Sequence, residues 1–160
     1  EVIVPATTFI ATVATVLQAG LMPVLCDVEY ETGNLQPDDL MKRWSKDIAA
    51  VIPVHLLGRA ANMLEIEAWC GFNPLPDILE DCCVSYNGQS VGSFGLAAAI
   101  STYVCHHVST GVGGAVLTNN DDIAVICRSL MQHGRDPEYL WLEDDYNLDD
   151  SQIAGMMRAR

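Results

Sequence analysis

Short apolar runs alternate with segments of helical apolar spacing along most of the 160 residues, and this alternation constrains the fold more than any other feature. The strand-like runs occupy residues 1–5, 22–28, 49–58, 76–83, 97–104 and 113–119. The helix-like segments occupy residues 7–20, 37–44, 62–70 and 121–134. Strands that alternate with helices predict an α/β fold, in which helices flank a mostly parallel sheet.

Local signals support several of these elements. Residues 49–58 form a continuous apolar run, which is typical of a strand that is covered on both faces. The segment 37–44 begins with a proline and two aspartates, which favour the first turn of a helix. The segment 121–134 begins with two aspartates and ends in His-Gly, so we expect a helix that stops there. We interpret the acidic stretch 138–150 as a solvated loop before a final helix.

Four polar residues lie at or near the predicted carboxyl ends of strands: Asp27, His55, Asp81 and His106. In a parallel sheet the functional loops gather beyond that edge. Asp81, in the motif ILEDCC, follows an apolar strand-like segment and has two interpretations. It is either a loop cap or ion-pair partner, or a charged partner for a cationic ring nitrogen or a metal.

The charge of the chain excludes several classes of partner. Eight Lys and Arg stand against 21 Asp and Glu, which gives a net charge of -13. Phosphate backbones and anionic membranes attract clustered cations, so we expect neither nucleic acid nor a membrane surface as a partner. No apolar run approaches the roughly 20 residues that span a bilayer, and residues 1–20 lack the basic start of a signal peptide. We therefore expect a soluble cytoplasmic protein.

The cysteines and the chain ends add two expectations. Cys82 and Cys83 are adjacent, and the other four cysteines fall in or beside apolar segments, namely Cys26, Cys70, Cys105 and Cys127. This placement predicts buried thiols in a reducing compartment rather than a disulfide framework. The chain starts in a strand-like run without a Met and stops within a helix-like one, so we expect a fragment of a longer protein.

The stretch 103–114, YVCHHVSTGVGG, sets two histidines just before a glycine cluster. A zinc site is disfavoured because Cys105, His106 and His107 are contiguous, which directs their side chains apart in an extended chain. A dinucleotide-binding turn is disfavoured because the glycines are followed by a strand-like run and not by a helix. A catalytic histidine and a plain polar turn both remain open.

A series of motifs resembles successive landmarks of a known family. In order, these motifs are PATTFIATVATVLQAGLMPVLCDVE, AAVIPVHLLG, ILEDCC, VGSFG, GGAVLTNND and SLMQHG. Together they resemble the DegT/DnrJ/StrS family of pyridoxal-phosphate-dependent sugar aminotransferases. The resemblance implies a type I aminotransferase fold, in which residues 1–160 form part of the large cofactor-binding domain. The upstream phosphate-binding segment and the C-terminal small domain would lie outside the chain, and the whole protein would be a homodimer.

The resemblance also implies roles for individual residues. Asp81 matches the carboxylate that pairs with the pyridine nitrogen of the cofactor. A carboxylate there keeps the nitrogen protonated, so that the ring can accept electrons. Phe9 matches the aromatic residue that stacks on the ring, although its pattern alone would favour a core helix residue. Ser101 matches a hydroxyl that binds the cofactor phosphate.

The position that holds the cofactor-binding lysine in the aminotransferases is occupied here by His106. An imidazole has no primary amine for a covalent bond to the cofactor, but it can take and return a proton near neutral pH. A histidine in this Y-x-x-H-H context resembles the 3-dehydratase branch, which uses the cofactor's amine form on nucleotide-linked 4-keto-6-deoxy sugars. The first hypothesis is therefore a pyridoxal-phosphate-dependent enzyme of nucleotide-sugar metabolism. Two departures from the family pattern support an alternative: Val112 stands where that branch has an acidic residue, and Val84 stands where aminotransferases often have Gln. This alternative is a non-catalytic relative that binds the cofactor or a sugar.

Overall fold

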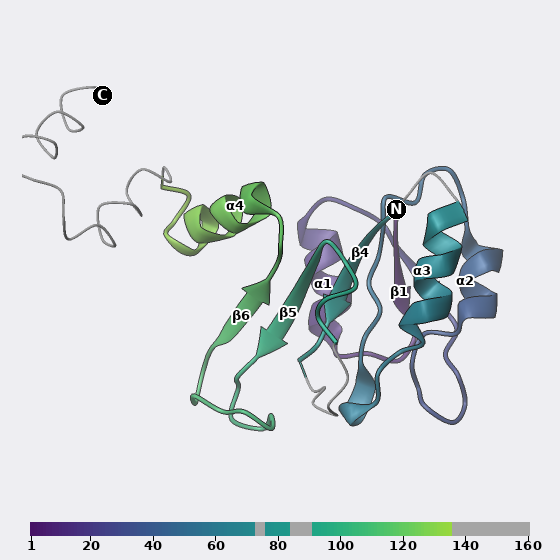
Figure 1. The fold of residues 1–160 in the computed structure, drawn as a ribbon, viewed down its shortest axis with the longest axis horizontal. Helices are drawn as coiled ribbons and strands as arrows, with labels where there is room; N and C mark the ends of the chain where they lie inside the picture. The colour runs from purple at the N-terminus through teal and green to yellow at the C-terminus, as the bar shows by residue number, and fades with distance from the viewer. Residues whose placement is uncertain (73–75, 84–90, 136–160) are drawn as a thin grey trace, which may run out of the picture. The chain divides into compact units, whose positions relative to one another are not determined.

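The computed structural model describes residues 1–72, 76–83 and 91–135 (Figure 1). The chain divides into two compact units, residues 1–119 and 120–160. The first unit contains the sheet and the candidate site. Among the described helices, none combines the length and the apolar character needed to cross a bilayer.

The described part of the first unit contains a six-stranded sheet with the strand order β2-β1-β3-β4-β5-β6. The strands are β1 (Val2–Pro5), β2 (Pro23–Cys26), β3 (Ala50–Val51), β4 (Asp77–Asp81), β5 (Ala97–Ser101) and β6 (Gly114–Leu117). Neighbours from β2 to β5 are parallel, and β6 runs antiparallel to β5. The prediction of an α/β fold with a mostly parallel sheet is therefore confirmed.

Helices cover both faces of this sheet. The helices of the first unit are α1 (Ile10–Gln18), α2 (Pro37–Arg43) and α3 (Met63–Phe72). Val16 of α1 packs with Val2 and Val4, whereas Leu40 of α2 and Ile66 of α3 pack in a second cluster, which contains Ile3 of β1. Side chains alternate between the faces of a strand, so β1 reads as a continuous apolar run because both of its faces are buried.

The second unit contributes one described helix, α4 (Asp121–Met131). The side chain of Asn120 caps it by accepting a hydrogen bond from the Ile123 N–H at 3.0 Å. Two aspartates in the first turn complement the positive end of the helix dipole. The helix ends just before His133 and Gly134, which have left-handed φ angles of 64° and 75°. The predicted helix over 121–134 is thus confirmed, with its last turn shortened.

The predicted strand over residues 49–58 is wrong beyond its first half. Pro53 has no N–H to donate, and β3 itself ends at Val51. A bridge to β4 resumes at Val54, where the His55 N–H donates to the Asp81 carbonyl at 3.0 Å. The chain then leaves the sheet in the 3-10 turn η1 (Leu56–Gly58), in which Leu57 has a positive φ of 51°.

Other predicted boundaries differ by a few residues. The helix expected from residue 7 begins at Ile10, and the strand expected to residue 104 ends at Ser101. The Thr102 N–H still donates to the Gly113 carbonyl at 2.9 Å, and the chain then turns at residues 104–105. The acidic stretch 138–150 and the expected final helix lie outside the described residues.

All six cysteines lie within the described residues and are free. Cys26 and Cys70 are buried as predicted, and burial raises the pKa of these thiols to about 12 and about 11. Cys105 is exposed, which contradicts its predicted burial. The reason is that β5 stops at Ser101, so Cys105 lies in a loop and not in a strand. Cys127 is half-buried on α4.

Candidate active site

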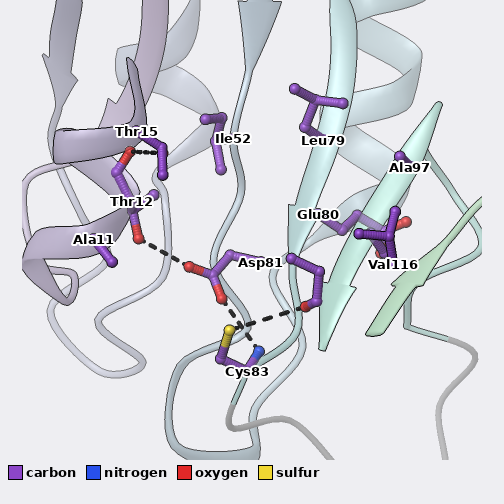
Figure 2. Close-up of a pocket in the computed structure, with 12 residues that line it drawn as sticks. Ala11, Thr12, Thr15, Ile52, Leu79, Glu80, Asp81, Cys83, Ala97 and Val116 are labelled. Carbon is purple, nitrogen blue, oxygen red and sulfur yellow. Dashed lines mark hydrogen bonds between the residues drawn. The ribbon is translucent and has the colours of Figure 1, made fainter. Parts of the chain in front are cut away.

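A cavity of about 320 Å³ lies between α1 and the neighbouring face of the sheet (Figure 2). Its lining is mostly apolar and comes from α1, from strands β4, β5 and β6, and from residues just beyond β3 and β4: Ala11, Thr12, Thr15, Ile52, Leu79, Glu80, Asp81, Cys83, Ala97, Ala98, Ala99 and Val116. The register pairs Leu79 with Ala97 and Asp81 with Ala99, so these four side chains share one face. The small alanines of β5 leave the space that a ligand can occupy.

Asp81 is the acidic residue that directs its carboxylate into this cavity (Figure 2). Its Oδ2 accepts a hydrogen bond from the Thr12 hydroxyl at 2.8 Å, and its Oδ1 accepts one from the Cys83 N–H at 3.2 Å. A carboxylate offers about four lone-pair positions, so acceptor capacity remains for a ligand. Burial, followed by the hydrogen bond and charge of Asp81, raises the pKa of the Cys83 thiol to about 12, so this thiol stays neutral.

Phe9 lies at the start of α1 and is 75% exposed, so its interpretation as a core helix residue is wrong. Its carbonyl accepts a hydrogen bond from the Thr12 N–H at 3.1 Å. The ring is not part of the cavity lining. Thr12 thus joins Phe9 to Asp81, through its backbone N–H on one side and its hydroxyl on the other.

Ser101 ends β5, two residues after Ala99, and so lies on the same face of the strand as the cavity lining. Its hydroxyl accepts a hydrogen bond from the Tyr103 N–H at 3.2 Å. The side chain is half-buried and lies next to the cavity along β5, but it is not part of the cavity lining.

His106 lies in the turn after β5 and is half-buried. Its N–H donates to the Tyr103 carbonyl at 2.9 Å, and the two rings meet edge to face with centroids 6.3 Å apart. Within the described part of the chain, its Nδ1 is the one buried side-chain polar atom without a hydrogen-bond partner. His106 does not line the cavity, so the structure does not bring it into contact with Asp81.

The glycine cluster after His106 lies where the two ends of the loop come together. The Thr102 and Thr110 hydroxyls are 2.7 Å apart. A Cβ on Gly113 would come within 2.8 Å of the Thr102 hydroxyl and 2.9 Å of the Thr110 hydroxyl. A side chain at Gly113 would therefore disrupt the contact that holds the two ends of the loop together.

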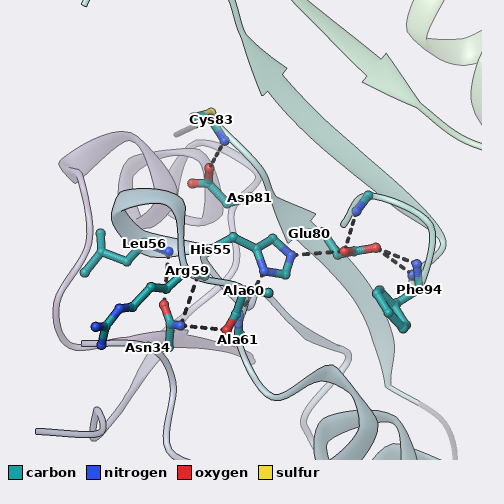
Figure 3. A network of polar contacts seen from close by, with 12 residues as sticks. Asn34, His55, Leu56, Arg59, Ala60, Ala61, Glu80, Asp81, Cys83 and Phe94 are labelled. Atoms are coloured by element: carbon teal, nitrogen blue, oxygen red, sulfur yellow. Dashed lines mark hydrogen bonds and ion pairs between the residues drawn. The ribbon is translucent and has the colours of Figure 1, made fainter. Parts of the chain in front are cut away.

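His55, the second histidine at the strand ends, has a different environment (Figure 3). It is completely buried, and its Nδ1 accepts the Ala61 N–H at 3.1 Å. The proton therefore lies on Nε2, which donates to Glu80 Oε2 at 3.0 Å. Asp27 is also not part of the cavity lining, and its N–H donates to Asp39 at 2.8 Å.

Glu80 was not identified from the sequence, although it is the most fully hydrogen-bonded carboxylate of the described residues. It accepts N–H groups from Gly92 at 2.7 Å, Phe94 at 2.7 Å and Gly95 at 3.0 Å, besides that of His55. Burial alone would raise the pKa of Glu80, but these four donors outweigh it and hold the pKa below its usual value. The motif VGSFG (residues 91–95) was the sequence signal that could have identified this role, because the N–H groups of its two glycines donate to Glu80.

His55, Glu80 and Cys82 lie close enough together to bind a metal ion. However, both imidazole nitrogens and both carboxylate oxygens already have partners within the chain. Burial raises the pKa of the Cys82 thiol to about 12, so it is not available as a thiolate. This cluster, the one group with suitable spacing among the described residues, is structural.

Comparison with known proteins agrees with this architecture. Residues 1–156 match the DegT/DnrJ/EryC1/StrS aminotransferase family. A pleiotropic regulatory protein of Geobacillus stearothermophilus is 36% identical over 96% of this chain and 43% of its own length. GDP-perosamine synthase of Vibrio cholerae is 33% identical over 84% of this chain and 37% of its own length. The chain thus spans less than half of these relatives.

A solved structure shows the same fold. Escherichia coli GDP-4-keto-6-deoxy-D-mannose-3-dehydratase with bound hydrated PLP superposes with a TM-score of 0.77 at 30% identity. The match covers 84% of this chain and 35% of the dehydratase. The mixed, mostly parallel sheet with flanking helices is therefore the fold of pyridoxal-phosphate enzymes of this family.

Proposed function

Because this chain belongs to the DegT/DnrJ/EryC1/StrS aminotransferase family, we propose that the protein containing it is a pyridoxal-phosphate-dependent enzyme of nucleotide-sugar metabolism. Residues 1–160 form part of its cofactor-binding large domain, and the whole protein is a cytoplasmic homodimer. The cofactor is pyridoxal phosphate or pyridoxamine phosphate. The substrate is a nucleotide-linked sugar with a keto group at C4 and a deoxy carbon at C6.

The position of Asp81 supports this proposal most directly. Its carboxylate faces a cavity of about 320 Å³, which is within the usual range of roughly 300–1,000 Å³ for ligand pockets. The two neutral donors from Thr12 and Cys83 leave acceptor positions for a protonated ring nitrogen. When bound, the cofactor supplies a conjugated ring that accepts electrons from the carbon attached to it. Asp81 favours the protonated form of the ring nitrogen and thereby strengthens this electron acceptance.

Three further residues complete the proposed site. Phe9, exposed at the start of α1, packs on the face of the ring, and the Ser101 hydroxyl binds the cofactor phosphate. His106 would take a proton from the carbon attached to the ring and return a proton later, since an imidazole can both accept and donate a proton. Because imidazole has no primary amine, His106 does not bind the cofactor covalently. This property favours a sugar 3-dehydratase over a transaminase.

One observation favours a second candidate function, a non-catalytic relative that binds the cofactor or a sugar. Val112, at the position where the dehydratase branch has an acidic residue, is 84% exposed in the loop that follows His106. The side chain of valine offers no hydrogen bond to a sugar, which supports the loss of the substrate contact that an acidic residue would make there. Catalysis and binding without catalysis differ in one measurable step, the movement of a proton.

Solvent exchange tests this step. Full-length protein is incubated in deuterated water with pyridoxamine phosphate and a 4-keto-6-deoxy nucleotide sugar, and exchange at the methylene carbon is followed by NMR. We expect exchange in the wild type and a rate about a hundredfold to ten-thousandfold lower in His106→Asn, the usual cost of losing a general base. His107→Asn, which changes the exposed neighbour, is the matched control. Cofactor binding without exchange in the wild type would favour the non-catalytic function.

Borohydride reduction tests the absence of a covalent bond. Treating full-length protein with pyridoxal phosphate and borohydride should leave no cofactor on the peptide that carries residues 101–114. A reduced cofactor attached to that peptide, seen by mass spectrometry, would contradict the role of His106.

A further inference from the structure

Thr12 connects the carboxylate of Asp81 to helix α1 (Figure 2). The side chain is only 6% exposed, and its hydroxyl lies 2.8 Å from Asp81 Oδ2 and 2.8 Å from the Thr8 hydroxyl. An ionised carboxylate only accepts hydrogen bonds, so the Thr12 proton points to Asp81. The Thr8 hydroxyl must then donate to Thr12. The result is a directed chain of hydrogen bonds from Thr8 through Thr12 to Asp81.

We propose that Thr12 is a positioning residue for the cofactor, which orients the carboxylate of Asp81 and fixes the start of the helix that carries Phe9. This role rests on the proposed function, because it concerns the same site. It adds to that function a residue whose hydroxyl acts through Asp81 without touching the cofactor.

The geometry of Asp81 supports the first part of this role. The terminal torsion of an aspartate is broad, so an unsupported carboxylate samples many orientations. Here Thr12 of α1 holds one oxygen, and the N–H of Cys83 beyond β4 holds the other. Donors from two separate elements fix the plane of the carboxylate before a ligand arrives, which reduces the entropy lost on binding.

The chemical nature of the donor supports it further. The ion pairs among the described residues are Arg43–Asp39 and His55–Glu80, so no cation of that part of the chain pairs with Asp81. A hydroxyl orients the carboxylate but leaves its negative charge in place. Asp81 therefore keeps the charge that a protonated ring nitrogen requires.

The start of α1 supports the second part. Phe9 occupies the N-cap position, but its side chain cannot accept the hydrogen bond that a usual cap provides. Instead, the Thr12 N–H donates to the Phe9 carbonyl at 3.1 Å, and the Thr8 hydroxyl contacts that of Thr12. Phe9 and its neighbour Thr8 thus both interact with Thr12, which ties the start of α1 to this residue.

A double-mutant cycle on full-length protein tests the role. The dissociation constant for pyridoxal phosphate is measured by absorbance titration for wild type, Thr12→Val, Asp81→Asn and the double variant. We expect Thr12→Val to weaken binding about tenfold, the loss expected for a hydrogen bond to a charged group. Thr12→Val keeps the backbone N–H that holds Phe9 and removes the hydroxyl that acts through Asp81, so it should have little further effect in the Asp81→Asn background.

Conservative variants separate positioning from general stability. Thr12→Ser keeps the hydroxyl and should bind within about twofold of the wild type, as should Thr7→Val, which removes an exposed hydroxyl outside the chain of hydrogen bonds. Thr8→Val should give a smaller loss than Thr12→Val, and urea unfolding checks that each variant folds. An unchanged affinity in Thr12→Val, or an equal loss in both backgrounds, would overturn the role of Thr12. A wild type that binds no pyridoxal phosphate would instead overturn the cofactor assignment, and this role with it.

Discussion

Glu80 and Asp81 are adjacent carboxylates at the end of one strand, yet they differ in burial and in hydrogen bonding. Glu80 is 2% exposed and accepts four hydrogen bonds, which come from His55 and from the backbone of residues 92–95. Asp81 is half-buried, faces the cavity on the other side of the sheet and accepts hydrogen bonds from Thr12 and Cys83. Figures 2 and 3 show these two environments.

The difference shows how to separate a structural carboxylate from a functional one. The protein itself supplies enough donors to satisfy Glu80, so this residue is satisfied without a ligand and stabilises the loops that it joins. Asp81 keeps acceptor positions open toward a cavity, so its remaining partners must come from outside the described residues. The number of donors, rather than the residue type, distinguishes the two roles.

The largest expected effect is the loss of stability when the buried carboxylate of Glu80 is removed. Glu80→Ala should lower the free energy of unfolding by about 3–5 kcal/mol, because it leaves the buried His55 N–H without its partner. Asp81→Ala should lower it by less than about 1 kcal/mol, because water in the cavity can replace the carboxylate. Urea denaturation of full-length protein measures both. Equal losses in the two variants would remove the distinction.

On the functional side, Asp81→Asn should weaken binding of pyridoxal phosphate by about 1.5–3 kcal/mol, or roughly 10- to 150-fold, as expected for a lost charged hydrogen bond. It should also abolish turnover, since a neutral partner no longer keeps the ring nitrogen protonated. Fluorescence titration and a steady-state assay check the two expectations. If affinity and rate both stay at the wild-type level, Asp81 is only a structural cap.

Acid should lower the free energy of unfolding less than the substitution Glu80→Ala does. Protonation of Glu80 removes its charge but leaves both of its oxygens in place. The pKa of Glu80 is held low in the folded state, so its contribution to stability is complete above the unfolded value of about 4.3. The contribution is lost as the pH falls through the lower folded-state pKa. Unfolding free energies between pH 7 and pH 3 should decrease accordingly, and Glu80→Gln should reduce the slope. A variant with the wild-type slope would contradict this assignment.

The smallest expected effect concerns Cys83. Its backbone N–H, which every residue except proline supplies, holds Asp81 Oδ1 at 3.2 Å. Cys83→Ala should therefore change the free energy of unfolding by less than about 1 kcal/mol and leave cofactor affinity within about twofold. A loss in affinity as large as that of Asp81→Asn would show that the Cys83 thiol, and not its backbone N–H, holds the carboxylate of Asp81 in place.

Much of the fold could be predicted from the sequence, but less of the site. The alternation of strands and helices was read correctly because apolar periodicity is a local signal. The run 49–58 was misread because its apolar residues do not reveal that Pro53 interrupts pairing or that His55 turns toward Glu80. The position of Asp81 at the end of β4 was anticipated, and its role and those of Phe9, Ser101 and His106 remain predictions.

The sequence by itself determined the α/β class, the approximate limits of most strands and helices, and the family, because each depends on patterns within short segments or on their order. Only the tertiary structure decided which carboxylate of the pair Glu80 and Asp81 is satisfied and which is open. That choice depends on donors from residues 12, 55 and 92–95. These donors are distant along the chain and meet at β4 only when the sheet assembles, so no local pattern contains the information.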